Sequence, residues 1–236
     1  MKAAFLCEFA TIRNILLQWI VLYLIVGVVV GIAMQSSVAM VACVTAMTPF
    51  LTVFTLAGYD ATGWERFRAC LPISRGAVAF GRYAMVLLVT VIMAVLAIAV
   101  ALILAQVAPA LPLEAGAAES LRAESDPLML ASAALAGASI ILVITAVILP
   151  FILRFGMTKA MRIIPIVMVL LFVMAVPVLG DVFSNMQGLT WVNDLLALLD
   201  DEEGLAAGMA AVAAVVLALY AASCAVAARL YRGKEL

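Results

Sequence analysis

Six long runs of apolar residues dominate this sequence, and none of them contains an aspartate, glutamate, lysine or arginine. A helix needs about 20 apolar residues to cross roughly 30 Å of hydrocarbon, and each run meets or approaches that length. Of the 236 residues, 68% are hydrophobic and 11% are charged, whereas soluble domains are about 45–50% apolar. We therefore predict one all-α polytopic membrane domain over residues 1–236, with six transmembrane helices at residues 15–34, 38–57, 83–107, 128–153, 163–180 and 205–228.

The charged residues outside these runs predict the orientation of the chain. Every lysine and arginine except Arg122 falls on one side of the six predicted spans, and most of the acidic residues fall on the other side. Loops rich in lysine and arginine stay in the cytoplasm. We therefore expect a multi-pass protein of the plasma (inner) membrane with both termini cytoplasmic.

The residue inventory excludes several functions. The sequence has no histidine, so it offers no histidine-based catalysis, and we expect no metal site. Aspartyl and rhomboid-like intramembrane proteases need ionisable residues that the predicted spans lack, and proton-coupled transport is disfavoured for the same reason. The chain also contains no GxxxxGK[ST] phosphate loop, so it does not bind ATP in that way. We expect it not to be an enzyme.

Two polar or small-residue patterns lie within the spans. A threonine stripe in the second span shares one helix face, since its members are three or four residues apart. It predicts either close helix packing or a mildly polar substrate path. A GxxxG pair in the first span predicts close contact with another helix, in this chain or in a second copy. The stripe comprises Thr45, Thr48, Thr52 and Thr55, and the pair is Gly27 and Gly31.

The segment between the second and third spans carries the most informative motif. Thr62 followed by Glu65 is a capping box, which predicts a helix that begins at Gly63 and ends before Pro72. Trp64, Phe67 and Leu71 share one face of that helix, and Ser74 is placed to cap the next one. A short helix with an aromatic face is either a docking element for a cytosolic protein or an interfacial helix with Trp64 in the aromatic belt.

This segment resembles the signature of small six-span permeases of bacterial ABC exporters, including those of lantibiotic-type immunity systems. The resemblance covers about 25 residues, and the short N-terminal interfacial helix of that family fits an apolar face formed by Phe5, Phe9, Ile12 and Leu16. The matching residues are Tyr59-Asp60, Gly63-Trp64, Arg66-Phe67, Leu71-Pro72-Ile73-Ser74-Arg75 and Gly81-Arg82-Tyr83.

The resemblance implies a membrane permease subunit that moves a peptide, lipid or hydrophobic small molecule by alternating access. Energy would come from a separate cytosolic ABC ATPase that binds ATP and Mg, and a second permease copy or a sister permease would complete the pathway. The resemblance makes Gly63–Leu71 the coupling helix that docks on the ATPase. The expected coupling residues are Asp60, Gly63, Trp64, Glu65, Arg66, Phe67, Arg68, Leu71, Pro72, Ser74 and Arg75.

Three points stay open at this stage. The same docking helix would serve a membrane scaffold or sensor that binds another cytosolic partner. The stretch Asp181–Gly204 is either a loop packed on the membrane surface or, by the resemblance, part of an outer gate. The acidic loop Ala108–Pro127 matches nothing in the family pattern.

Overall fold

The computed structural model describes residues 2–64, 70, 74–110, 116–157, 159–160, 162, 165 and 202–233. Helices account for nearly all of them. The elements are α1 (Lys2–Met34), α2 (Ser37–Tyr59), the helical turn η1 (Asp60–Trp64), α4 (Arg75–Val107), the 3-10 turn η2 (Ala108–Ala110), α5 (Ala117–Ala123), α6 (Pro127–Phe155) and α9 (Glu202–Arg232).

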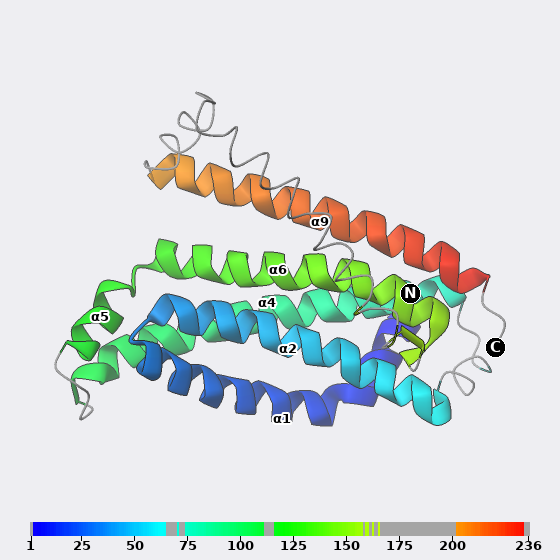
Figure 1. The fold of residues 1–236 in the computed structure, drawn as a ribbon, viewed down its shortest axis with the longest axis horizontal. Coiled ribbons are helices and arrows are strands. Elements are labelled where there is room, and N and C mark those ends of the chain that lie inside the picture. Colours follow the sequence, from blue (N-terminus) through cyan, green and yellow to red (C-terminus); the bar gives the residue numbers. More distant parts are fainter. Residues whose placement is uncertain are drawn as a thin grey trace.

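The long helices form a bundle in which α1, α2, α4 and α6 lie side by side and α9 packs on α6 and α4 (Figure 1). The chain reverses from α1 to α2, from α2 to α4 and from α4 to α6, and α9 runs parallel to α6. One end of the bundle therefore holds the start of α1, the end of α2, the start of α4 and the ends of α6 and α9. We call it the basic end, since Arg75, Arg154 and Arg232 lie there. The opposite end holds the α1–α2 turn and α5.

Five of the described helices are long and apolar enough to cross a membrane, and they contain the first, second, third, fourth and sixth predicted spans. Their outer surfaces fit this role: Leu17, Val21, Ile25 and Val29 form an exposed apolar stripe along α1. The fifth predicted span, residues 163–180, lies outside the described residues except for Pro165. The stretch Asp181–Gly204 was expected to form a loop or part of an outer gate. It lies outside the described residues up to residue 201.

The start of α1 differs from the prediction. We expected a short interfacial helix ahead of the first span, but α1 is continuous from Lys2 to Met34, because no glycine or proline interrupts it before Gly27. Its first turns, darkest blue in Figure 1, run at an angle to the rest of the helix. The predicted apolar face is also wrong in part. Phe9 is exposed, and the buried positions are spaced four residues apart at Ala4, Glu8, Ile12 and Leu16.

Glycines allow the closest helix contacts. A methyl group on Gly27 would stand 2.2 Å from a Val44 methyl carbon, and one on Gly31 would stand 3.1 Å from the Met40 Cβ. The predicted GxxxG pair therefore packs α1 against α2 of the same chain. A methyl group on Gly137 would stand 2.6 Å from the Ala42 carbonyl oxygen, so α6 contacts α2 backbone to backbone.

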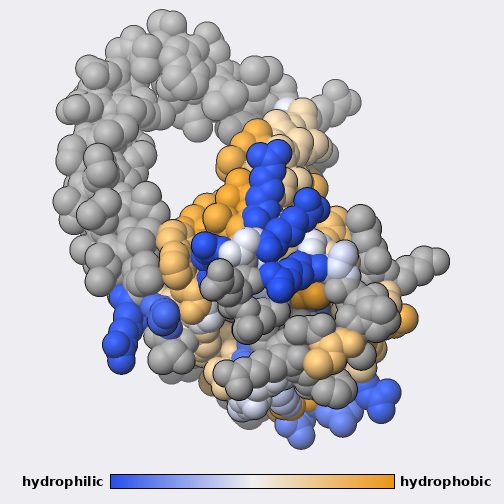
Figure 2. Space-filling model, turned by 90° about the vertical axis from the view of Figure 1, so that its right-hand side faces the viewer, coloured by the Kyte–Doolittle hydropathy of each residue, from blue (hydrophilic) through white to orange (hydrophobic). Residues whose placement is uncertain are grey.

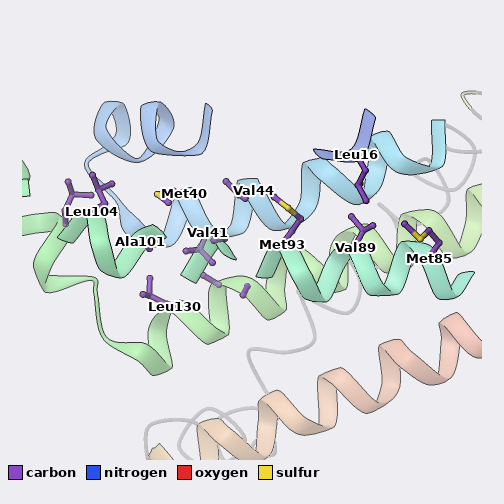
Figure 3. Close-up of a cluster of buried hydrophobic side chains, with 14 of the residues drawn as sticks. Leu16, Met40, Val41, Val44, Met85, Val89, Met93, Ala101, Leu104 and Leu130 are labelled. Atoms are coloured by element: carbon purple, nitrogen blue, oxygen red, sulfur yellow. The ribbon is translucent and has the colours of Figure 1, made fainter. Parts of the chain in front are cut away.

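Methionine, valine and leucine side chains fill the space between α1, α2, α4 and α6. Figure 3 shows Val44 of α2 near Met93 of α4, and Leu16 of α1 opposite Val89 of α4. Met40, Met85 and Met93 are fully buried, and such flexible side chains fill irregular gaps between helices. The four helices thus share one core.

The threonine stripe of α2 faces this packed interior. Thr45, Thr48 and Thr52 are buried, while Thr55 is half-buried. The Thr45 hydroxyl donates to the Val41 carbonyl at 2.8 Å and the Thr52 hydroxyl donates to the Thr48 carbonyl at 3.0 Å. These bonds within the helix favour the packing interpretation.

Tyrosines hold α9 against α4 and α6. The Tyr220 hydroxyl donates to the Tyr83 carbonyl at 3.0 Å, and the two rings lie 4.9 Å apart. The Tyr83 hydroxyl pairs with the Ser223 hydroxyl, which in turn donates to the Ala146 carbonyl of α6. Hydrogen bonds of this kind hold helices together where water is absent.

The acidic loop 108–127 has a structural role at the opposite end. The Glu124 carboxylate accepts from the Ser36 hydroxyl at 2.6 Å and from the Val38 backbone N–H at 3.3 Å. The carboxylate therefore sits at the positive N-terminus of α2, where negative charge is stabilising. Nearby, the Ser37 hydroxyl donates to the Leu121 carbonyl, which ties α5 to the α1–α2 turn.

Candidate functional site

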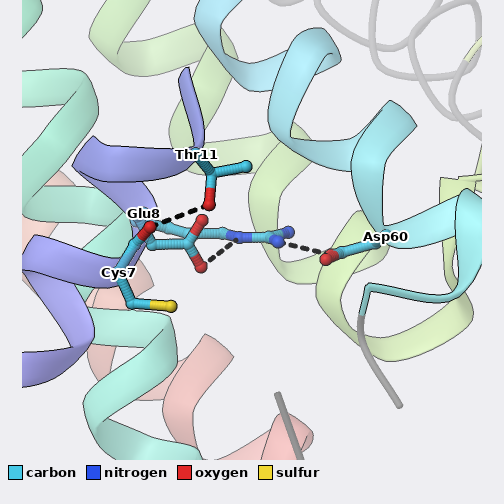
Figure 4. Close-up of polar contacts among 5 residues, drawn as sticks. Cys7, Glu8, Thr11 and Asp60 are labelled. Atoms are coloured by element: carbon cyan, nitrogen blue, oxygen red, sulfur yellow. Dashed lines mark hydrogen bonds and ion pairs between the residues drawn. The ribbon is translucent and has the colours of Figure 1, made fainter. Parts of the chain in front are cut away.

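A buried ionic cluster lies at the basic end, where three helices meet. Arg82 of α4 is 1% exposed, and its Nε lies 3.4 Å from the Glu8 carboxylate of α1, which is also 1% exposed. Its terminal nitrogen donates to the carboxylate of Asp60, at the end of α2. Figure 4 shows the guanidinium between the two carboxylates. We call these three residues the charge triad.

Local sequence explains how three charges meet inside a bundle. Gly81 precedes Arg82, and a methyl group there would stand 3.3 Å from the backbone of Ala4 and Phe5. The glycine thus lets α1 approach α4 closely, which brings Glu8 to Arg82. Asp60 reaches Arg82 from the other side because α2 continues past the predicted end of the second span at residue 57.

The turn after Asp60 corrects the predicted start of the coupling helix. Gly63 has a φ of 97°, which is a left-handed conformation typical of a helix end and not of a helix start. The Thr62 hydroxyl donates to the Tyr59 carbonyl at 2.7 Å, so it bonds to the preceding turn of the chain. Trp64 follows as a half-buried residue at the end of η1.

Much of the predicted coupling helix lies outside the described residues. The structure places Asp60, Gly63, Trp64, Ser74 and Arg75 at the basic end, on both sides of this segment. The prediction that Ser74 caps the next helix is confirmed, since its hydroxyl accepts from the Ala77 N–H at 3.3 Å. The residues outside the described ranges are Glu65, Arg66, Phe67, Arg68, Leu71 and Pro72.

Arginines of two helices hold the end of α9. Arg75 of α4 donates to the Arg232 carbonyl at 3.3 Å, and Arg154 of α6 donates to the Leu230 carbonyl at 3.2 Å. Positive side chains stabilise a helix C-terminus, where the backbone carbonyls have no partner within the helix. Figure 2 looks onto this end, where hydrophilic side chains gather in the middle and hydrophobic flanks lie beside them.

The members of the charge triad come from three different helix ends. Arg82 and Glu8 are buried and bind each other, and Arg82 also binds Asp60 at the end of α2. The triad therefore connects three helices beside the segment that was predicted to dock a partner. Sequence reasoning named Asp60 but gave no role to Glu8 or Arg82. One signal was available: Glu8 shares the four-residue spacing of Ala4, Ile12 and Leu16, so a charge lies on the buried face of α1.

Comparison with known proteins identifies the family of the chain. The model of the family described as "ABC-2 family transporter protein" matches residues 5–232. No curated protein and no solved structure matches the chain. The family match includes the first turns of α1, all five described spans and the segment between α2 and α4. The chain therefore belongs to the ABC-2 family of transporter proteins and is a multi-pass membrane permease of an ABC transporter.

Proposed function

We propose that this permease is the membrane subunit of an ATP-driven exporter, which moves a peptide, lipid or hydrophobic small molecule by alternating access. The observation that carries the proposal is the position of the α2–α4 connection. It starts from Asp60, Gly63 and Trp64 and returns at Ser74, at the end of the bundle that holds Arg75, Arg154 and Arg232. That end is cytoplasmic by the positive-inside rule, so the connection faces a cytosolic ATPase.

The partner ATPase supplies the chemistry in this proposal. It binds ATP and Mg, and its closure pushes on the segment that contains Trp64, Phe67 and Leu71. Aromatic side chains are frequent anchors of protein interfaces, and lid-like closure around a nucleotide is a common source of such motion. A second permease copy or a sister permease would form the other half of the pathway.

The substrate class follows from the predicted spans, which contain no charged side chain. A path without fixed charge suits amphipathic or hydrophobic molecules and gives no site for a driving proton. A groove of about 440 Å³ between α4, α6 and α9 supports this class, because alanine, leucine and valine side chains form most of its lining. The remaining lining includes Thr90 and Ser139.

The test is co-purification followed by transport. The permease is expressed with the ATPase of the neighbouring reading frame, purified in mild detergent and reconstituted in liposomes with an amphipathic peptide, a fluorescent phospholipid or a hydrophobic dye. We expect the ATPase to co-purify and ATP to drive the transport of one of these probes. Purification without any ATPase would contradict the proposal and favour the scaffold or sensor function.

A tryptophan variant tests the docking segment itself. Trp64→Ala removes the aromatic anchor, so we expect it to weaken ATPase binding and to uncouple transport while the permease still inserts into the membrane. Trp19→Ala, which removes a tryptophan from the middle of α1, is the matched control. Normal ATPase association and normal export in Trp64→Ala would refute the role of this residue.

A further inference from the structure

One guanidinium joins three segments that are far apart in the sequence. Arg82 lies 74 residues from Glu8 and 22 residues from Asp60. Glu8 belongs to the first turns of α1, and Asp60 to the end of α2, three residues before the left-handed Gly63. The end of α2, where the docking segment begins, is therefore bound to α1 and to α4 through the same side chain.

The chemistry of arginine suits a contact that links three helices. The guanidinium is planar and rigid, and its N–H donors point in fixed directions. Here Nε faces Glu8 and a terminal nitrogen faces Asp60. A displacement of Asp60 must either move the guanidinium or break the bond between them. A moving guanidinium in turn displaces Glu8. A lysine, with a single ammonium on a flexible stem, does not hold two carboxylates in this fixed relation.

Burial makes stability alone a weak explanation for the triad. Glu8 and Arg82 are 1% exposed, and taking charges out of water costs more than most ion pairs return, so an apolar cluster of similar volume often serves stability equally well. What an ionic cluster adds is a defined geometry between the elements that carry the charges. This geometry is found at the junction with the docking segment.

We propose that Arg82 is the positioning residue that transmits displacement of the α2–α4 connection to α1 and α4. This inference rests on the proposed function, because it takes the ATPase as the source of the displacement. Through Asp60 the end of α2 follows the docking segment, and through Arg82 and Glu8 the starts of α4 and α1 follow α2. The three helix ends then move as one unit during the cycle.

The experiment measures ATP hydrolysis and helix movement separately. Spin labels are attached to cysteines at Met34 of α1 and Ala206 of α9, which are exposed near the opposite end, in a chain whose four native cysteines are replaced by alanine. The distance distribution is recorded in the reconstituted complex without nucleotide and after trapping with ATP and vanadate. Glu8→Gln removes the charge of the triad's α1 member at nearly constant volume, at a residue outside the predicted docking segment. Glu124→Gln is the matched control, because Glu124 is also a carboxylate that binds a second helix, at the other end of α2.

We expect the wild type and Glu124→Gln to change their distance distribution on trapping. We expect Glu8→Gln to keep its ATPase and to hydrolyse ATP while its distribution stays at the nucleotide-free form. A Glu8→Gln variant that moves like the wild type would overturn the inference. Loss of the ATPase from this variant would overturn it as well, because Glu8 would then be part of the docking surface. A wild type without bound ATPase would instead contradict the proposed function.

Two further variants distinguish loss of the connection from a simple folding defect. If the triad acts as one unit, Glu8→Gln together with Asp60→Asn should reduce movement no further than the worse single variant, since effects within a unit are not additive. Effects that multiply would show two independent roles and overturn the inference. Arg82→Lys keeps the charge but not the geometry, so we expect it to insert and fold while losing movement. Full movement in Arg82→Lys would show that charge alone suffices.

Discussion

Replacement of Arg82 by methionine gives a sharp test of the energetics of the charge triad. Methionine fills a similar space without charge, so the variant leaves the carboxylates of Glu8 and Asp60 facing a buried apolar side chain. Removing one partner of a buried ion pair costs about 3–5 kcal/mol, because the remaining charge is uncompensated. Glu8 is 1% exposed, whereas Asp60 is 11% exposed and keeps some contact with water. We therefore expect a loss at the lower end of that range, about 3 kcal/mol.

The assay is the unfolding of purified permease in mixed micelles, followed by helical circular dichroism as the fraction of denaturing detergent rises. The control is the triple variant Glu8→Gln, Arg82→Met, Asp60→Asn, which removes all three charges together. Since replacing a complete buried ionic cluster is often neutral, the triple variant should recover most of the stability lost by Arg82→Met. A loss below about 1 kcal/mol in Arg82→Met, or a triple variant less stable than the single one, would refute the assignment of a buried, mutually compensating triad.

Three further predictions concern the packing of the bundle and use the same unfolding assay. Gly137→Val should destabilise the permease by about 1–3 kcal/mol, the usual cost of overpacking. The reason is that even the Cβ of the new side chain would lie 2.6 Å from the Ala42 carbonyl oxygen. Unchanged stability would refute this close contact between α6 and α2. Ser36→Ala should cost about 1 kcal/mol, since it removes the N-cap of α2, and a neutral result would contradict that cap. Tyr220→Phe should cost about 1 kcal/mol by removing the hydrogen bond to the Tyr83 carbonyl, and equal stability would show that this bond does not hold α9.

The helical architecture was readable from sequence because the membrane imposes a simple rule. Long runs without charge must be helices, and the five described spans lie where those runs predicted them. Capping chemistry was equally local, so Ser74 was identified as an N-cap from its position before α4. The predicted count of six depends on residues 163–180, which lie outside the described residues apart from Pro165.

One error is local, and the other involves a contact between distant residues. Thr62 and Glu65 fit a capping box, but Gly63 adopts a left-handed φ and ends the preceding helix; spacing alone does not distinguish a helix start from a helix end. The buried face of α1 was misassigned because an apolar pattern favours Phe9, whereas the structure buries Glu8. The four-residue spacing with Ala4, Ile12 and Leu16 places Glu8 on the buried face. Its partner Arg82 is 74 residues away, so a rule based on neighbouring residues does not find the ion pair.

The central claim, that the α2–α4 connection is the docking site of an ATPase, can be tested at a native residue. Cys70 lies in this connection and is exposed. With the other three cysteines replaced by alanine, a short photoreactive crosslinker attached to Cys70 should capture the ATPase in the reconstituted complex. The same crosslinker on a cysteine at Met34, near the opposite end of the bundle, should capture none. Absence of the ATPase from the Cys70 adduct in a complex that still hydrolyses ATP, or equal capture at both positions, would contradict the claim.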